Sequence, residues 1–481
     1  MQLSPVLNIL GLLATILAGS MLIPMCVDLY AASSDWQVFA MSALLTGFFG
    51  VSVWLATNRR ETLDLGLRQA FLLTNGAWVI ISVFGALPFM FSELELSITD
   101  SIFESVSGIT TTGSTVLVQI EIASPGILIW RALLQWLGGV GIVVMAMAVL
   151  PMLSVGGMQL FRTESYERPE SVVPRATQLA GGIGLVYAGL TALWAIMLSL
   201  AGMNAFDAVA HSMTTLATGG FSTRTASIGA FDSAAIEWII VVGMIVGSLP
   251  FAHYLAMIRG GWRSLINDPQ VRWFLILVAG LVLLLCWNLM QNGQGFGEAF
   301  REASFNGISI MTGTGYVSAN FSAWGGFAST ILLLVMFIGG CGGSTTCGIK
   351  VFRLQVLAAT VKVQVHRLLR PHAVVLAYYN RRPVASEVMD SVMGFFYLYI
   401  LGFVMIAILL GLSGLDFVTA LSGAATSISN VGPGLGEVIG AEGNFSSLPD
   451  SAKWIMSFAM LLGRLEIFTV LVMLNPEFWK R

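Results

Sequence analysis

Long apolar segments recur along this chain and constrain its fold more than any other feature. Each has about 20 residues, enough to cross the hydrocarbon core of a bilayer. They lie near residues 4–30, 36–56, 70–92, 128–152, 178–201, 236–258, 273–290, 327–352, 390–412 and 454–474. Only 10% of the residues are charged, whereas a soluble domain carries about 25%. We therefore predict an all-α integral membrane protein with about ten spanning segments.

Basic residues gather in alternate loops, within 59–68, 162–175, 259–272, 350–382 and 480–481. The positive-inside bias places these loops on the cytoplasmic side. The intervening loops carry acidic residues such as Glu121, Asp207 and Asp416. Their acidity either attracts cations to an outer entrance or reflects the ordinary polarity of loops.

Four short segments between the apolar runs resemble one another. They read DSIFESVSGITTTGST (100–115), FDAVAHSMTTLATGGFST (206–223), FREASFNGISIMTGTGYVS (300–318) and DFVTALSGAATSISNVGPG (416–434). Each has small, Ser/Thr-rich or apolar residues and then a turn centred on a glycine, at Gly113, Gly220, Gly315 or Gly432. Such self-similarity indicates an internal repeat.

The repeating unit is an outer helix, a short re-entrant helix, a turn and an inner helix. A re-entrant segment is tolerated in a bilayer only where protein buries it or where it lines water. Four such segments at one depth favour a ring around a pseudo-fourfold central pore. The expected domains are a two-helix accessory domain at 1–62 and pore repeats at 63–165, 166–265, 266–370 and 371–481.

The glycine turns have the composition of a cation selectivity filter. Backbone carbonyl rings replace the water shell of an alkali cation, and glycine supplies the positive φ that such turns need. One such segment alone is more often a polar kink, but four in register favour a filter. The expected filter residues are Thr111, Thr112, Gly113, Thr218, Gly219, Gly220, Gly313, Thr314, Gly315, Asn430, Val431 and Gly432.

A glycine-rich stretch, FIGGCGGSTTCGIK (337–350), interrupts the third inner helix. Each helical glycine costs about 1 kcal/mol relative to alanine, so the helix is expected to break there and form a gating loop. Close helix packing through small residues is the alternative. The expected gate comprises Gly339, Gly340, Gly342, Gly343, Ser344, Thr345, Thr346 and Gly348, together with Arg464.

Arg464 lies within the fourth inner helix, where a charge is costly and usually functional. It either projects beneath the filter as an electrostatic barrier or pairs with Glu466 or backbone carbonyls. We expect Arg131 at the outer interface and Lys350 reaching the cytoplasmic face. His211 is expected to be a hydrogen-bonded packing residue. The four cysteines, Cys26, Cys286, Cys341 and Cys347, are interpreted as buried free thiols.

The chain resembles the Trk/Ktr/HKT superfamily of potassium transporters, and most of all its TrkH/TrkG type. The motifs that carry the resemblance are FESVSGITTTGST, HSMTTLATGGFST, SNVGPGLGEV and GRLEIFTVLVMLNPEFWK, and it covers nearly the whole chain. Two departures stand out. Gly313 replaces the more frequent Thr of the third repeat, and the gate loop reads GGSTTCGIK where relatives often have GGSTGGGIK.

The resemblance implies potassium uptake across the bacterial inner membrane, with potassium as the transported substrate. It also implies a homodimer embedded in lipid, with one pore per subunit. A cytoplasmic, TrkA-like, nucleotide-binding ring would control gating. In this family a glycine at the position of Gly113 accompanies potassium selectivity, whereas a serine accompanies sodium preference. The intramembrane loop and inner-helix arginine of the family match Gly339–Gly348 and Arg464.

Two other functions compete with a potassium channel or channel-like transporter. One is symport of potassium with sodium or protons through broken helices, for which Glu466 is the main candidate carboxylate. The other is a membrane-embedded enzyme. The chain has no HExxH motif, and its four histidines are scattered, so we expect no catalytic site. Nothing points to a nucleic-acid partner.

Overall fold

The computed structural model describes residues 3–57, 66–148, 156–157, 172–258, 260–261, 263–380 and 382–480, without side chains at 147–148 and 172–179. Seven helical segments in this part are long and apolar enough to span a membrane, and two bent helix pairs pass the same test. Nine of the roughly ten expected spanning segments thus correspond to a continuous or bent span. The segment near 327–352 is a short helix followed by a loop.

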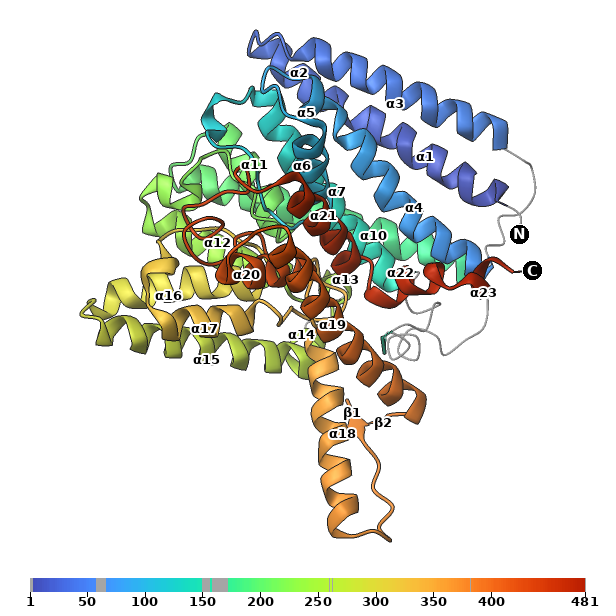
Figure 1. The fold of residues 1–481 in the computed structure, drawn as a ribbon, viewed down its shortest axis with the longest axis vertical. Helices are drawn as coiled ribbons and strands as arrows, with labels where there is room; N and C mark the ends of the chain where they lie inside the picture. The colour runs from blue at the N-terminus through green and yellow to red at the C-terminus, as the bar shows by residue number, and fades with distance from the viewer. Residues whose placement is uncertain are drawn as a thin grey trace.

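The N-terminal helices form a layer along one side of the bundle (Figure 1). α1 (Ser4–Ser20) and α2 (Leu22–Tyr30) make one span, and α3 (Trp36–Thr57) returns antiparallel to it. α1 packs along both α3 and α4, the first helix of the repeats. The Asp28 side chain accepts a hydrogen bond of 2.6 Å from the backbone N–H of Gly126, and so it fastens this pair to the first inner helix.

The remaining chain repeats one helical plan four times. Repeat 1 comprises α4 (Leu67–Gly85), α5 (Leu87–Phe91), α6 (Ile98–Ile109), η1 (Ile120–Ile122) and α7 (Pro125–Ala148). Repeat 2 comprises α10 (Val172–Leu200), α11 (Ala205–Leu216), η2 (Ser227–Phe231), α12 (Ala234–Gly247), α13 (Phe251–Ile258) and α14 (Arg263–Asn267).

Repeat 3 comprises α15 (Pro269–Gln291), α16 (Phe296–Met311), η3 (Phe321–Ala323), α17 (Gly326–Val335) and α18 (Val351–Leu369). A short hairpin, β1 (Tyr378–Tyr379) with β2 (Arg382–Pro383), leads into repeat 4. That repeat comprises α19 (Ser386–Leu412), α20 (Phe417–Ser429), α21 (Asp450–Arg464), α22 (Ile467–Leu474) and α23 (Pro476–Trp479).

Packing between repeats follows a circular order. The inner helix α7 packs on the short helix α11 of the next repeat, α12 packs on α16, and α21 packs on α6 of the first repeat. The chain is thus an all-α protein with several candidate membrane spans, and its repeats are arranged around a common centre.

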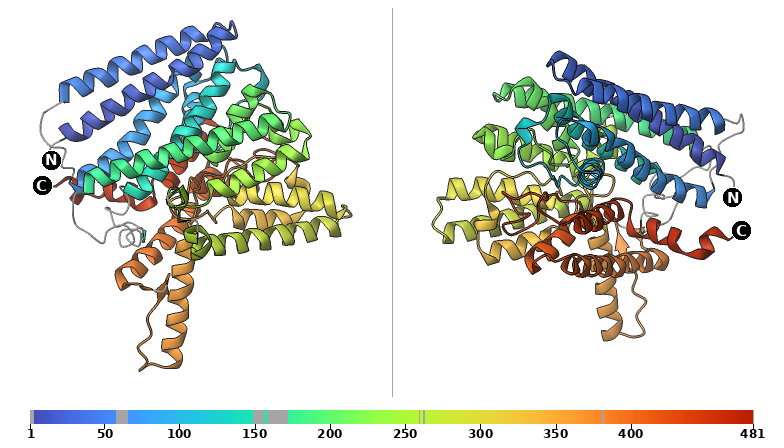
Figure 2. Two further views of the ribbon diagram at one scale, coloured as in Figure 1. Left: turned by 180° about the vertical axis from the view of Figure 1, so that it is seen from behind. Right: turned by 45° about the horizontal axis from the view of Figure 1, so that its top comes forward.

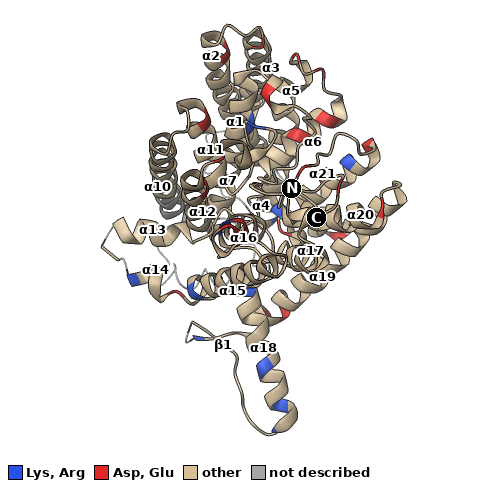
Figure 3. Ribbon diagram, turned by 90° about the vertical axis from the view of Figure 1, so that its left-hand side faces the viewer, with Lys and Arg blue, Asp and Glu red and all other residues tan. Residues whose placement is uncertain are grey.

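Charge separates the two ends of the bundle. Figure 3 looks along the spans and shows acidic residues on the loops around α2, α6 and α20, and basic residues on α14 and α18. The positive-inside bias makes the first of these the outer end. Arg59, Arg60, Arg162, Arg168, Arg259, Arg381 and Arg481 lie outside the described residues.

Three of the four short helices begin with a side-chain cap, which favours their start at these residues. Ser97, Asn204 and Asp416 accept hydrogen bonds from backbone N–H groups in the first turns of α6, α11 and α20. All four short helices end just before a glycine turn. The polar, partly negative C-terminal ends of these helices therefore point at the same set of turns.

Candidate functional site: a ring of four glycine turns

The four turns share one backbone conformation. The first residue of each takes a left-handed conformation, with φ of 54° at Thr111, 50° at Thr218, 68° at Gly313 and 55° at Asn430. Two residues later a glycine again has positive φ: 88° at Gly113, 77° at Gly220, 79° at Gly315 and 111° at Gly432. Such repetition in segments with different sequences shows that the four turns are structurally equivalent.

The turns close into a ring through glycine–carbonyl contacts. A Cβ added to Gly113 would lie 2.3 Å from the carbonyl oxygen of Gly219 in repeat 2. The same construction places a Cβ on Gly220 at 1.8 Å from the oxygen of Thr314, and one on Gly315 at 2.1 Å from that of Val431. A Cβ on Gly432 would lie 2.8 Å from the oxygen of Thr112, which returns to repeat 1. No side chain fits at any of these contacts.

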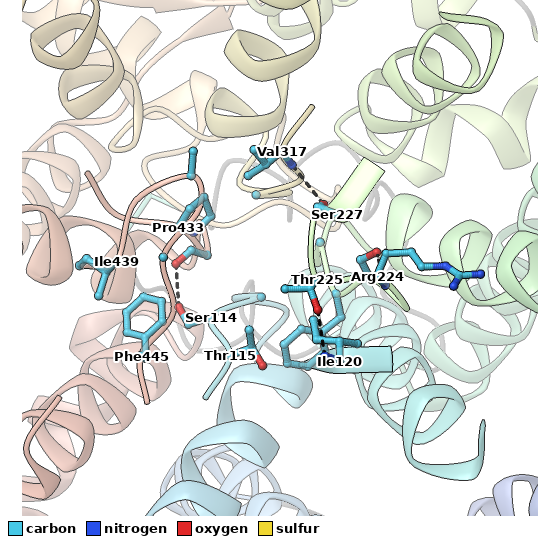
Figure 4. A pocket seen from close by; sticks show the side chains of 18 of the residues that line it. Ser114, Thr115, Ile120, Arg224, Thr225, Ser227, Val317, Pro433, Ile439 and Phe445 are labelled. Atoms are coloured by element: carbon cyan, nitrogen blue, oxygen red, sulfur yellow. Dashed lines mark hydrogen bonds between the residues drawn. The ribbon is translucent and has the colours of Figure 1, made fainter. Parts of the chain in front are cut away.

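A cavity opens on the outer side of the ring (Figure 4). It has about 80 Å³ of room for water, and all four ring glycines line it. Ser114, Phe221 and Pro433, each the residue after a ring glycine, line it as well. The Ser114 hydroxyl donates a 2.8 Å hydrogen bond to the Gly432 carbonyl, and so it joins repeats 1 and 4 at this level.

Side-chain hydrogen bonds hold the ring in register. The Asn430 amide donates to the Thr112 hydroxyl at 2.9 Å and to the Met460 carbonyl at 2.9 Å. In α7, the Gln135 amide donates to the Gly219 carbonyl at 2.5 Å, and its oxygen accepts from the backbone N–H of Phe221 at 3.0 Å. We did not identify Gln135 from the sequence, although a polar residue inside an apolar span was a usable signal.

Tyr316 connects the third turn to the short helix of repeat 2. It is fully buried, and its hydroxyl is hydrogen-bonded to the Thr214 hydroxyl and donates to the His211 carbonyl at 3.3 Å. The His211 ring is itself held by the Asp207 carbonyl at 2.7 Å and the Ser222 hydroxyl at 2.9 Å. The expectation that His211 is a hydrogen-bonded packing residue is confirmed.

Arg131 is buried in the protein and lines the cavity on the outer side of the ring. Its expected place at the outer interface of the membrane stays a prediction. Its exposed fraction is 1%, and its Nε donates to the Glu104 carboxylate at 2.8 Å. It also donates to the Ser222 carbonyl at 2.8 Å and lies over the Phe221 ring. This buried ion pair therefore contacts residues next to the turns of repeats 1 and 2 and stabilises both turns.

The glycine-rich stretch breaks the third inner helix, as expected. α17 ends at Val335 and α18 begins at Val351. The loop between them is internally ordered: the Thr346 hydroxyl accepts from the backbone N–H of Gly340 at 2.9 Å and is hydrogen-bonded to Ser344 at 2.8 Å. The Lys350 ammonium donates to the Thr346 carbonyl and is buried. The expectation that Lys350 reaches the cytoplasmic face was therefore wrong.

The loop is fastened to a second break, between α12 and α13, where the chain bends by 93°. The Thr345 hydroxyl donates to the carbonyls of Leu216 at 3.0 Å and Gly247 at 2.9 Å. The backbone N–H of Cys341 donates to the Ser248 carbonyl at 3.0 Å, and that of Phe251 donates to the Gly343 carbonyl at 3.0 Å. The loop of repeat 3 therefore supplies hydrogen-bond partners to backbone groups at the break in the repeat 2 helix.

Arg464 lies between three repeats beneath the ring. Its guanidinium donates to the Thr345 carbonyl at 3.1 Å and to the Gly138 carbonyl of α7 at 2.8 Å, and it contacts the Cys347 sulfur at 2.6 Å. Of the partners considered for it, backbone carbonyls are confirmed and Glu466 is not. Glu466 instead accepts a 2.6 Å hydrogen bond from Arg353, which is also buried.

The cysteines in the described part of the chain are free, but only three are buried. Cys286, Cys341 and Cys347 lie in the interior, whereas Cys26 is exposed on α2. The expectation of burial was thus wrong for Cys26, which faces outward from a helix on the periphery of the bundle.

Comparison with known proteins identifies the family. A model of the family described as "TrkH: Cation transport protein" matches residues 36–481. The chain belongs to the TrkH family. The resemblance inferred from the motifs is therefore confirmed, and members of this family are membrane transport proteins rather than enzymes.

Relatives within the TrkH family align along the whole chain. It is 43% identical to the Trk system potassium uptake protein TrkI of Halomonas elongata, over 99% of this chain and 97% of that protein. It is 40% identical to TrkH of the same organism, with complete coverage of both chains. The crystal structure of the potassium transporter TrkH from Vibrio parahaemolyticus superposes with a TM-score of 0.91 at 36% identity, over all of both chains.

Proposed function

We propose that this chain takes up potassium across the bacterial inner membrane through the ring of four turns. The closed circuit of glycine–carbonyl contacts is the observation that supports this most directly, because it brings backbone oxygens of all four repeats to one place. Carbonyl rings replace the hydration shell of a potassium ion. Relatives over the full length are named potassium uptake proteins.

The four short helices add an electrostatic contribution. Each ends within a few residues of the ring, so its partly negative C-terminal end favours a cation there. Uptake would follow the membrane potential, which supplies about 2.3 kcal/mol per charge per 100 mV. In this proposal Thr111, Thr112, Gly113, Thr218, Gly219, Gly220, Gly313, Thr314, Gly315, Asn430, Val431 and Gly432 form the filter.

The loop at 339–348 and Arg464 would form the gate beneath it. The hydrogen bonds of Arg464 to Thr345 and Gly138 support this role, because they connect the loop to the first inner helix across the region under the ring. A mobile loop in that position would block the ion until it is displaced. Basic residues at the cytoplasmic end suit a regulatory TrkA-like ring, and the family resemblance favours a homodimer.

Symport with sodium or protons has less support. Coupling usually uses carboxylates or histidines at the midplane, and Glu466, the main candidate, is held by Arg353 at 2.6 Å. Reversal potentials in proteoliposomes at varied pH and sodium would separate the two functions. Potentials that track potassium alone are expected, and stoichiometric dependence on sodium or protons would establish symport.

Ion flux through the purified protein in liposomes tests the proposed function. We expect potassium and rubidium to pass readily and sodium and lithium much less, because a ring of fixed carbonyls replaces the hydration of the larger ions more completely. Equal flux of all four ions, or a preference for sodium, would overturn the proposal.

A further inference from the structure

A groove far from the ring lies at the cytoplasmic end of the molecule. It is formed by the start of α15, one side of α18 and the returning segment 375–380. Its volume is about 550 Å³, which is within the range of small-molecule sites, about 300–1,000 Å³. Its polar lining includes Lys362, His366 and Tyr378, and Trp273, Ala358 and Val363 supply apolar surface.

The groove lies where a bilayer meets the cytoplasm. α15 is a candidate span beginning at Pro269, so Trp273 is in its first turns. Tryptophan and tyrosine concentrate at this depth of a membrane. α18 projects from the bundle crosswise to α15 and α17, as Figures 1 and 2 show, so it extends along the membrane plane rather than through it.

Basic residues outnumber acidic ones in the segment that forms most of this groove. No acidic residue occurs between 303 and 386 in the sequence. Within the described part of the chain, the Lys362 ammonium has neither a hydrogen bond nor an ion pair, and His366 lies one helical turn further along the same side. Asp268, next to the groove residue Pro269, is already paired with His253 at 2.7 Å. An anionic ligand would therefore meet uncompensated positive charge.

Apolar side chains lie beside this charge. Val361, Val365 and Leu368 are exposed on α18, with exposed fractions of 54%, 49% and 82%. An interfacial helix with basic and apolar sides binds membranes through both acyl contacts and anionic headgroups. Basic pockets on the cytoplasmic side between helices accommodate such headgroups.

We propose that this groove binds an anionic phospholipid of the inner leaflet. The phosphate lies near Lys362, His366 and Tyr378, while the acyl chains follow Trp273 and Val363. The site is independent of the filter and would anchor α18, which directly follows the gate loop, to the membrane.

Native mass spectrometry of the purified full-length protein, exchanged into micelles with phosphatidylglycerol or phosphatidylcholine, tests this. Retention of phosphatidylglycerol over phosphatidylcholine is expected. Lys362→Gln should lower that retention about fivefold or more, because one basic residue near an anionic headgroup contributes about 1 kcal/mol to binding. Ala358→Trp should also lower it by filling the groove at an exposed position without changing charge. Arg370→Gln is the matched control, because it removes a positive charge from the same helix end outside the groove.

Four results would overturn the assignment. Equal retention of both lipids, or a loss in Arg370→Gln as large as in Lys362→Gln, would show only general charge attraction. Displacement of the lipid by millimolar inorganic phosphate would show a phosphate site. A change of oligomeric mass in Ala358→Trp with lipid retention unaltered would assign the groove to a protein contact. Potassium flux through Lys362→Gln in liposomes should persist, so failure here is separable from failure of the proposed filter.

Discussion

At the scale of single residues, Thr111, Thr218 and Asn430 adopt a left-handed backbone that side chains other than glycine rarely take. Each such residue costs of order 1–3 kcal/mol and persists only where its surroundings impose it. Glycines in repeated segments made the turns themselves predictable. The conformation of the two threonines was not, because a left-handed residue at the end of a helix is usually Gly or Asn. In both turns the following residue donates its backbone N–H back to its own short helix, from Thr112 to the Ser107 carbonyl and from Gly219 to the Thr214 carbonyl.

Gly113→Ser should weaken selectivity for potassium over sodium. Its Cβ would lie 2.3 Å from the Gly219 carbonyl, so the ring must open at that contact. Cation flux in liposomes measures the change as a permeability ratio. Gly202→Ser is the matched control, because Gly202 also has positive φ, at 100°, but has nothing within 4 Å of an added Cβ. Unchanged ratios in Gly113→Ser, or equal changes in both variants, would contradict the filter assignment.

Tyr316→Phe should lower selectivity without removing the pore. The hydroxyl that connects the third turn to Thr214 and the His211 carbonyl would be lost, at a cost of about 0.5–1.5 kcal/mol per hydrogen bond. The permeability ratio of rubidium to sodium reports the loosened turn. Tyr397→Phe, on a side chain that is 68% exposed, should leave the ratio unaltered. A Tyr316→Phe ratio equal to that of the wild type would show that these hydrogen bonds do not shape the filter.

At the scale of elements, three of the inner helices are interrupted, whereas α7 is continuous over the residues described for it, Pro125–Ala148. The break after Val335 follows from its glycines, and the break between α12 and α13 coincides with Pro250, which cannot continue a helix. The 109° bend between α21 and α22 has neither a glycine nor a proline at its centre. Glu466 there has φ 66° and ψ 117°, and this strain is supported by its ion pair with Arg353. Only the tertiary structure reveals such a break.

Arg353→Gln and Glu466→Gln should each destabilise the protein by about 3–5 kcal/mol, because each leaves a buried charge without its partner. The double variant should recover part of that loss. Unfolding by denaturant, compared across the four proteins of this cycle, measures the coupling. Arg224→Gln, which breaks a pair whose arginine is 39% exposed, should cost below about 1 kcal/mol. If the losses of unfolding free energy in the two single variants add up in the double variant, Arg353 and Glu466 do not stabilise the protein as a pair.

Thr345→Val should raise basal potassium flux. It removes the hydroxyl that binds the Leu216 and Gly247 carbonyls, so the closed loop loses about 1–3 kcal/mol relative to a displaced one. Deletion of residues 342–347 should act in the same direction more strongly. Thr330→Val, whose hydroxyl bonds only within α17 at Gly326, provides the control. Flux that stays at the wild-type level in a folded deletion variant would exclude the loop as a gate.

At the scale of the whole molecule, composition and repetition were sufficient to predict a helical membrane protein with four repeats. The circular packing order, in which α7, α12 and α21 each contact the short helix of the following repeat, came from the structure. The structure also revealed the hydrogen bonds that attach the repeat 3 loop to the break between α12 and α13 in repeat 2. Those contacts join segments far apart in the sequence and depend on shape complementarity, which no local pattern encodes.

The ring itself can be examined directly by crystallising this protein with rubidium and recording anomalous scattering. Rubidium is similar in size to potassium and scatters strongly at its absorption edge. A peak on the axis enclosed by the turns at 111–113, 218–220, 313–315 and 430–432 is the predicted result. Rubidium flux through the protein, combined with anomalous peaks elsewhere and none inside those turns, would contradict a filter built from all four repeats.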